Sequence, residues 1–278
     1  MMNRAATLPG SAYGFRIAGV GGRYLQEADD ATRPLLTVRR VVRDGRSGAA
    51  VSPPGSRTMA LVGGGRLVLD GATLTATYEL PAYLDDDDLA HPFLAASASV
   101  MAGWQGWDVF HAGAFSRNGR AVALLGRREQ GKSTLLAAMA LEGTDVVTDD
   151  VVVVEQGRAH VGPRCIDLRS PGAEQAFPGA PLERSRAGDR LRLALPCLDV
   201  VPELVGWVSL AWDERLELVP LRPSQRLQRL ASSHSRAGSP RDDALLELAR
   251  LPGWELRRPR RLELLPEATG RLLELPTP

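Results

Sequence analysis

The sequence of 278 residues contains a single lysine, Lys132, and every other basic side chain apart from histidine is an arginine. A general drift toward arginine explains this bias but not the one lysine that remains. Where a compact ammonium on a flexible stem is needed, a planar guanidinium is a poor replacement. The shortage also excludes the Asn-Lys-x-Asp motif with which GTPases read guanine, because Lys132 follows a glycine.

Cysteines and long apolar runs are also scarce. The two cysteines, Cys165 and Cys197, lack metal-binding spacing and cannot make a disulfide framework, so we expect reduced thiols. No apolar run is long enough to cross a bilayer, and the N-terminal segment MMNRAATLPGSAYG lacks the apolar core of a secretory signal. These absences predict a cytoplasmic protein with no membrane partner.

The charge balance does not indicate a nucleic-acid partner. A net charge of +1 is far from the strongly basic balance of such proteins. The one basic run, Arg257 to Arg261, is interrupted by a proline, and we expect it to be a solvated strand edge. An ordinary globular protein that does not bind nucleic acid is therefore expected.

The first part of the chain has the pattern of a small β-rich domain. Between Tyr13 and Pro81, short apolar or alternating runs are separated by Gly, Pro and Ser clusters. Four aspartates, Asp85 to Asp88, then precede apolar residues at helical spacing. They could form a metal cluster, but carboxylates at a helix N-terminus also cap its amides, and we favour the cap. We predict a β-rich domain over residues 1–98.

The rest of the chain, residues 99–278, is predicted to be an α/β domain. Strand-like runs such as RAVALLG and DVVTDD lack polar alternation, as expected for strands covered by helices on both faces. Further strands are expected in GWVSLAWD and LELVPL, and helices in SQRLQRLASS, RDDALLELARL and PEATGRLLEL. The segment from Ser170 to Asp189, rich in Gly, Pro and Arg, is expected to be a mobile loop.

The strongest motif is the pattern G-x-x-x-x-G-K-[ST] from Gly126 to Ser133, with an apolar strand before it and an Ala/Leu-rich helix after it. Such a loop holds nucleotide phosphates with its backbone amides, while Lys132 reaches the β- and γ-oxygens and Ser133 ligates Mg²⁺. We therefore expect ATP and Mg²⁺ as cofactors. The residues expected to form the nucleotide site are Gly126, Arg127, Arg128, Glu129, Gln130, Gly131, Lys132, Ser133 and Thr134.

Glu129 departs from the usual composition of these loops, which often have glycine at this position. Its carboxylate would repel phosphate if it pointed inward, and Arg127 and Arg128 would then compensate. Because only the backbone must face the ligand, we favour an arrangement in which all three side chains point to solvent.

A pair of carboxylates follows the loop and its helix. Asp149 and Asp150 end one apolar run and precede another, VVVVE. They could form a plain turn between strands. Beside a phosphate loop they could instead hold Mg²⁺ and take the proton from an attacking hydroxyl, and we favour this role. His111 lies in an apolar strand, and this pattern by itself predicts a histidine of the core.

Three segments together, FHAGAF, GRREQGKSTLLAAMA and TDDVVVV, resemble the catalytic domain of bacterial HPr kinase/phosphorylase. They resemble still more closely the smaller HPr-kinase-like proteins found with lasso and other ribosomally made peptides. The resemblance covers Trp107 to about Arg169, and the C-terminal tail looks like the family's closing strand and helix. It implies a P-loop HPr-kinase-like catalytic domain preceded by a smaller β-rich domain.

The resemblance also implies roles for individual residues. Asp149 would be the base that deprotonates a serine or threonine hydroxyl, and Asp150 would be its partner near Mg²⁺ together with Ser133. His111 would tune the base. Arg190, in the segment AGDRLRLALP, would be a clamp on transition-state charge, although a surface arginine is an equal alternative. The glycine-rich signature that follows the acidic pair in true HPr kinases is missing, which argues against HPr as the substrate and against phosphorylase activity.

Two main functions follow from these features. The first is a kinase that phosphorylates a serine or threonine hydroxyl of a peptide or small protein, most plausibly a lasso-type peptide, with a homo-oligomer allowed by the resemblance. The second is a regulatory nucleotide-binding module without catalysis or with slow hydrolysis. A third alternative, a structural protein with a decayed loop, draws support from Glu129.

Overall fold

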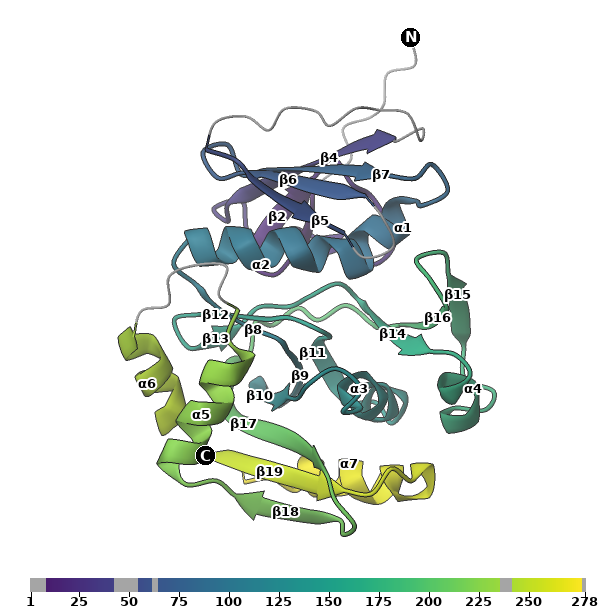
Figure 1. Cartoon of the computed structure of the whole chain (residues 1–278), viewed down its shortest axis with the longest axis vertical. Helices are drawn as coiled ribbons and strands as arrows, with labels where there is room; N and C mark the ends of the chain where they lie inside the picture. Colours follow the sequence, from purple (N-terminus) through teal and green to yellow (C-terminus); the bar gives the residue numbers. More distant parts are fainter. Residues whose placement is uncertain (1–8, 43–54, 62–64, 236–241, 277–278) are drawn as a thin grey trace.

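The computed structural model describes residues 9–42, 55–61, 65–235 and 242–276, and it contains an upper β-rich layer and a lower α/β layer (Figure 1). The upper sheet has the strand order β3-β1-β2-β4-β7-β6-β5. Its members are β1 (Gly10–Ala12), β2 (Phe15–Ala18), β3 (Gln26–Glu27), β4 (Leu35–Val42), β5 (Arg57–Ala60), β6 (Arg66–Asp70) and β7 (Thr75–Leu80). The predicted β-rich character of this region is confirmed.

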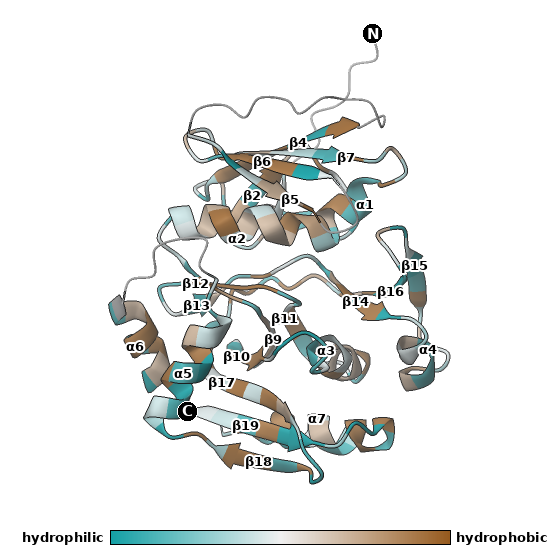
Figure 2. Cartoon of the chain, in the orientation of Figure 1, coloured by the Kyte–Doolittle hydropathy of each residue, from teal (hydrophilic) through white to brown (hydrophobic). Residues whose placement is uncertain are grey.

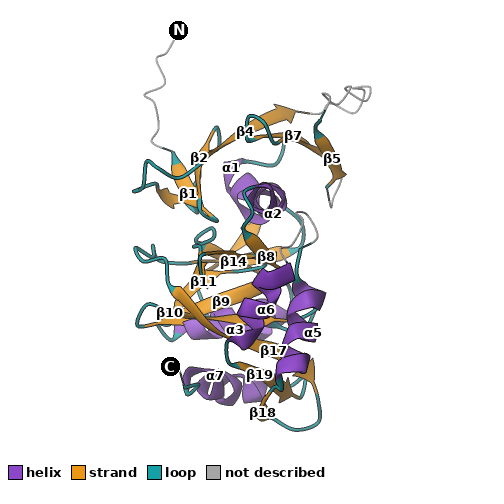
Figure 3. Ribbon diagram, turned by 90° about the vertical axis from the view of Figure 1, so that its left-hand side faces the viewer, coloured by secondary structure: helices purple, strands orange, loops and turns teal. Residues whose placement is uncertain are grey.

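The upper sheet buries one face because its strands alternate. In β7 every second residue is buried, and these residues share a core with the helix that follows. That helix, α2 (Leu94–Trp104), lies between the upper sheet and the strands below it (Figure 3). In Figure 2 much of α2 is coloured as hydrophobic, as expected for a helix covered on opposite sides.

The four aspartates cap a helical turn. Asp85 accepts a hydrogen bond from the Asp88 amide and donates its own amide to the Asp88 carboxylate, both at 3.1 Å, at the start of α1 (Asp86–Asp88). Asp86 and Asp87 accept from the backbone amides of Gly21 and Arg23 at 3.0 and 3.1 Å. The capping prediction is confirmed. A π-helical turn, η1 (Leu89–Phe93), joins α1 to α2.

The predicted domain boundary, between residues 98 and 99, falls inside α2. Buried residues on both sides of that position, including Ala98 and Met101, belong to the core of the upper sheet. The same core also includes Val109 and Val153 of the lower layer, so α2 packs against both layers.

The lower layer is built on a nine-stranded sheet, in which β10, β17 and β19 run parallel and β9 runs antiparallel to β10. The first five of its strands are β8 (Asp108–Phe110), β9 (Ala112–Arg117), β10 (Arg120–Leu125), β11 (Asp145–Thr148) and β12 (Val152–Glu155). The other four are β13 (Arg158–Ala159), β17 (Glu203–Trp212), β18 (Glu217–Pro220) and β19 (Gly253–Arg258). The predicted α/β class is confirmed.

Helices cover both faces of this sheet, which explains the unbroken apolar run of β10. Val122 and Leu124 pack into a core with α3 (Lys132–Leu141) and α7 (Leu265–Leu273). Ala121 and Ala123 pack on the opposite face, with α5 (Pro223–Ser233) and α6 (Asp242–Arg250). The short helix η2 (Leu262–Leu264) precedes α7. All the strands and helices predicted for residues 203–273 are present.

A third, three-stranded sheet lies beside α3, in the order β14-β16-β15. It comprises β14 (Cys165–Arg169), β15 (Leu182–Ser185) and β16 (Arg190–Ala194), with α4 (Gly172–Ala176) after β14. The prediction of a loop from Ser170 to Asp189 is therefore wrong for α4 and β15, since backbone pairing with β16 organises the latter. Among the described residues, no helix is long and apolar enough to cross a membrane.

Candidate active site

A tight loop, Gly126 to Gly131, joins the end of β10 to the first residue of α3. Gly131 has φ +78, and a Cβ there would overlap the Arg258 guanidinium. Gln130 folds back so that its side-chain oxygen accepts the Arg127 amide at 2.5 Å. Glu129 also has a left-handed backbone, φ +69, which glycine adopts at lower cost. The loop therefore has the sharp turn that its sequence predicts.

Lys132 is buried against this loop, with 6% of its surface exposed. Its Nζ donates to the carbonyl oxygens of Gly126 at 2.7 Å and Arg127 at 3.4 Å, and lies 3.2 Å from His111 Nε2. Burial lowers the pKa of Lys132, and the carboxylates of the acidic pair oppose that shift. The ammonium thus sits at the mouth of the loop, beside the acidic pair.

Asp149 is anchored to the start of α3. The Ser133 hydroxyl donates to Asp149 Oδ1 at 3.1 Å, while Asp149 Oδ2 is buried and has no hydrogen-bond partner within the described ranges. Burial, followed by the charge of Asp150, raises the pKa of Asp149 well above its ordinary value. Asp149 therefore has one satisfied oxygen and one that lacks a partner.

Asp150 has different surroundings from Asp149, although it is the next residue in the sequence. It lines the open cavity in front of the loop, and its backbone is left-handed, with φ +66. Since β11 ends at Thr148, the chain turns sharply at Asp150 before β12 begins at Val152. This turn directs the two carboxylates to different surroundings, one buried and one at the cavity.

His111 sits at the break between β8 and β9, where its amide donates to the Ser233 carbonyl at 2.8 Å. Its ring lines the cavity next to Lys132, so its interpretation as a core histidine is wrong. Partial burial, followed by the Lys132 charge, lowers the pKa of His111, which favours the neutral ring. The structure therefore places His111 beside Lys132 and near Asp150.

The cavity has a volume of about 800 Å³ and a large excess of positive charge. Seven arginines and Lys132 line it, against the carboxylates Glu129, Asp150 and Asp167. Apolar side chains, including Phe177 and Leu265, form another part of its wall. A charge distribution of this kind attracts a polyanion, and the apolar part offers contact to a flat ring.

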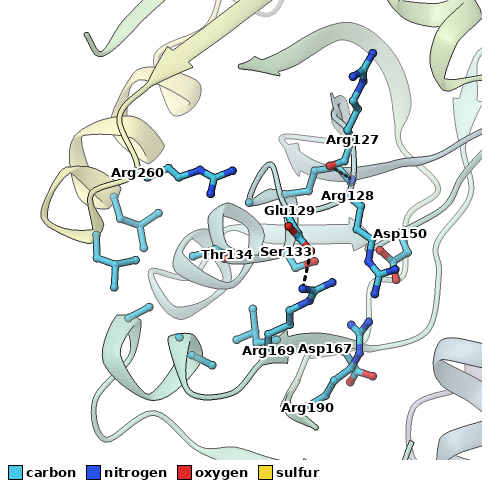
Figure 4. Close-up of a pocket in the computed structure, with 18 of the residues that line it drawn as sticks. Arg127, Arg128, Glu129, Ser133, Thr134, Asp150, Asp167, Arg169, Arg190 and Arg260 are labelled. Atoms are coloured by element: carbon cyan, nitrogen blue, oxygen red, sulfur yellow. Dashed lines mark hydrogen bonds and ion pairs between the residues drawn. The ribbon is translucent and has the colours of Figure 1, made fainter. Parts of the chain in front are cut away.

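Arg190 is one of the cavity arginines, so the structure places it at the site and not on a remote surface. In the view of Figure 4, the side chains of Arg190 and Arg128 extend toward the part of the cavity that Asp150 borders. Arg127 extends the other way. The charged side chains of the loop are all exposed, as expected, but the exposed side chain of Arg128 extends into the cavity.

Glu129 forms an exposed ion pair beside the cavity. Its Oε1 accepts from Arg169 Nη1 at 2.8 Å, and both side chains are about half exposed (Figure 4). The carboxylate remains on the cavity wall. Thr134 also lines the cavity, next to Ser133.

The basic run at the end of β19 differs in part from the solvated strand edge that the sequence predicts. Arg258 is 7% exposed; its guanidinium lies 4.3 Å from the centre of the Trp212 ring and donates to the Gln130 carbonyl at 3.0 Å. Arg260 contacts the same ring, and Arg261 lines the cavity. The predicted solvated strand edge is therefore wrong for Arg258, whereas Arg260 and Arg261 are exposed, as predicted. The signal in the sequence was the clustering of arginines in RRPRR.

No protein-family model matches the chain, and a search of curated proteins returns no match. Among solved structures, the HPr(Ser) kinase/phosphatase from Coxiella burnetii aligns with 59% of this chain and with 95% of its own length. The two share 16% sequence identity, with a TM-score of 0.31. At this level of similarity the alignment does not assign an activity to the chain.

Proposed function

We propose that the chain is an ATP- and Mg²⁺-dependent kinase that transfers the γ-phosphate to a serine or threonine hydroxyl of a peptide or small protein. The observation that carries this proposal is the arrangement around Ser133: its hydroxyl is joined to buried Asp149, while Asp150 lines the adjacent cavity. A phosphate loop, a cation-binding carboxylate and a candidate base thus meet at one end of α3.

The nucleotide would bind with its phosphates at the N-terminus of α3. Backbone amides of the loop and the positive end of the helix dipole favour negative charge there. Lys132 lies beside the loop, where its ammonium contacts two carbonyl oxygens. When a nucleotide binds, the ammonium would contact phosphate oxygens instead and would gain a partner of opposite charge. The excess of arginines supports a ligand with several negative charges.

The oxygen donors near Ser133 fit Mg²⁺. This cation prefers oxygen ligands in octahedral geometry, and the Ser133 hydroxyl with the Asp149 carboxylate supplies two of them. The buried Asp149 Oδ2, which lacks a partner, supports a site for a positive charge. When bound, Mg²⁺ neutralises the charge that develops on the phosphate oxygens.

The positions of the two aspartates support an exchange of the roles that the family resemblance implies. Asp150 borders the cavity, where an acceptor hydroxyl would arrive, and would take its proton. Asp149 is buried and joined to Ser133, so it would hold the cation. His111 and Lys132 lie beside the acidic pair and would orient it. Arg190 and Arg128 would stabilise negative charge on the transferred group.

The acceptor class is proposed from the sequence resemblance. The smaller HPr-kinase-like proteins accompany ribosomally made peptides, so we propose a lasso-type peptide with an accessible serine. The upper β-rich layer would help to recognise it.

The test is phosphate transfer from γ-labelled ATP to serine-containing peptides, followed by mass spectrometry. Asp150→Asn should lower transfer by roughly 100- to 10,000-fold, the usual contribution of a general base, while MgATP binding is retained. Glu214→Gln, an exposed carboxylate after β17, is the matched control and should behave as wild type. Transfer that persists in Asp150→Asn would refute its role as base, and no transfer to any acceptor would refute the kinase.

A regulatory nucleotide-binding module is the second candidate, and Glu129 favours it. A carboxylate on the wall of the phosphate site weakens nucleotide binding, which suits a sensor better than an efficient catalyst. Stoichiometric ATP binding with no transfer and with slow hydrolysis would support this function over the first.

A further inference from the structure

His91 is a buried histidine that the proposed kinase mechanism does not use. It belongs to the η1 turn of the upper layer, and only 1% of its surface is exposed. Neither ring nitrogen has a hydrogen-bond partner within the described part of the chain. Buried polar atoms are nearly always paired, so two unpaired nitrogens on one ring point to a missing ligand.

The unpaired ring lies next to the acidic pair. One ligand atom each from His91, Asp149 and Asp150 can be chosen so that all three lie within 4.8 Å of one another. Asp149 also has a buried oxygen without a partner. Three groups with metal-binding chemistry, two of them with unsatisfied atoms, therefore converge on one point from segments far apart in the sequence.

The backbone of His91 is fixed in place by a buried ion pair. Arg192 donates through Nη2 to the His91 carbonyl at 2.5 Å and pairs with Asp167 at 2.7 and 3.0 Å. Asp167 Oδ2 lies 3.9 Å from His91 Nε2, too far for a hydrogen bond. The His91 ring is thus held beside the acidic pair, with no hydrogen-bond partner among the described residues.

We propose that His91, Asp149 and Asp150 together bind a divalent first-row transition-metal ion, for which Mn²⁺ is the best match. A mixed set of one imidazole and two carboxylates suits Mn²⁺ better than Mg²⁺, which prefers oxygen ligands alone. Bonds of about 2.1 Å place neighbouring ligand atoms roughly 3 Å apart and opposite ones roughly 4.2 Å apart, so the three groups would move closer together around the ion. Since each carboxylate gives one oxygen, the other oxygen of Asp149 remains with Ser133, and the other oxygen of Asp150 remains available to take the proton of the acceptor hydroxyl.

This metal site adds a nitrogen ligand from the upper layer to the proposed kinase site. Its role in catalysis rests on the proposed function. A bound ion would offset the charge of two adjacent carboxylates, one of them buried. It would also fasten η1 to the end of β11, and so connect the upper layer with the acidic pair. The metal preference of the enzyme would then depend on a residue outside the phosphate loop.

The test uses the full-length protein, stripped with EDTA and titrated with Mn²⁺ in the absence of nucleotide. Loss of the free Mn²⁺ signal in electron paramagnetic resonance measures affinity, and pulsed experiments detect coupling to ¹⁴N. We expect one bound Mn²⁺ with histidine nitrogen coupling. His91→Gln should remove that coupling and weaken Mn²⁺ binding at least tenfold.

Two matched variants separate His91 from other histidines. His111→Gln removes the cavity histidine, and His160→Gln removes a buried histidine elsewhere; both should retain the nitrogen coupling. Absence of coupling in the wild type, or its loss in His111→Gln instead of His91→Gln, would overturn the proposal. If His91→Gln fails to fold, the wild type and these two variants still decide, because coupling that persists in both variants cannot come from His111 or His160. Mn²⁺ binding without phosphate transfer would refute the kinase but not this site.

Discussion

The Ser133 hydroxyl donates a hydrogen bond to Asp149 Oδ1 at 3.1 Å, and this contact joins the first turn of α3 to the end of β11. It connects the glycine-rich loop with the acidic pair, which the sequence separates by a complete helix. Because α3 also packs against β9 and β11, the two parts of the candidate site are held in one rigid unit.

Lys132→Arg should abolish MgATP binding although it preserves charge. The side chain is buried between two loop carbonyls and His111, and a guanidinium is too broad for that space. We expect an affinity loss of about 100-fold or more, measured by titration calorimetry. Arg117→Lys, an exposed position on β9, is the reverse control and should bind normally. Normal binding by Lys132→Arg would mean that the ammonium does not contact phosphate.

Glu129→Gly should strengthen nucleotide binding. The substitution removes a carboxylate from the cavity wall. Loss of its repulsion should improve the binding free energy of ATP by about 1 kcal/mol, which is roughly fivefold in affinity. The exposed ion pair with Arg169 contributes little to stability, and glycine accepts φ +69. Glu129→Ala removes the same charge but keeps the backbone strain, so it should bind ATP equally well and be about 1 kcal/mol less stable than Glu129→Gly. Weaker binding by both variants would instead show that Glu129 supports the nucleotide.

Gly131→Ala should disrupt the loop through Arg258. Its left-handed backbone strains any side chain by about 1–2 kcal/mol, and the new Cβ would also displace the Arg258 guanidinium. Gly143→Ala is the matched control, because Gly143 has φ +86 and open space around it. Both variants should lose stability in urea, but only Gly131→Ala should lose about tenfold or more in ATP affinity. Equal ATP affinity in the two variants would mean that Arg258 has no part in binding.

His160 should make the apo protein less stable in acid. It is buried against Trp107, and burial lowers its pKa below the ordinary 6.5, although its contact with Glu155 at 3.0 Å opposes the shift. The unfolded chain therefore takes up a proton below about pH 6.5 that the folded chain resists, so stability falls as pH decreases through that range. In His160→Gln, thermal unfolding from pH 7 to 5 should show a smaller decrease. An unchanged pH profile would mean that folding does not lower the pKa of this histidine.

Much of the lower layer was predictable because its signals are local. The β10 strand, the tight loop and α3 follow from an apolar run, two glycines and an Ala/Leu-rich segment, which fix backbone geometry over short distances. The aspartate cap of α1 was predictable for the same reason. The Ser170–Asp189 segment was not, because β15 depends on pairing with β16 and α4 is a single short turn.

The loop pattern, the single lysine at Lys132 and the adjacency of Asp149 and Asp150 can be read from the order of residues alone. The difference between these two carboxylates depends on the folded chain, since a left-handed turn at Asp150 leaves one buried and the other at the cavity. Folding also brought Arg258 and His91 to the site, from 126 residues after Lys132 and 41 residues before it. Such contacts arise from packing between distant segments, where long side chains meet across layers, and no local pattern records them.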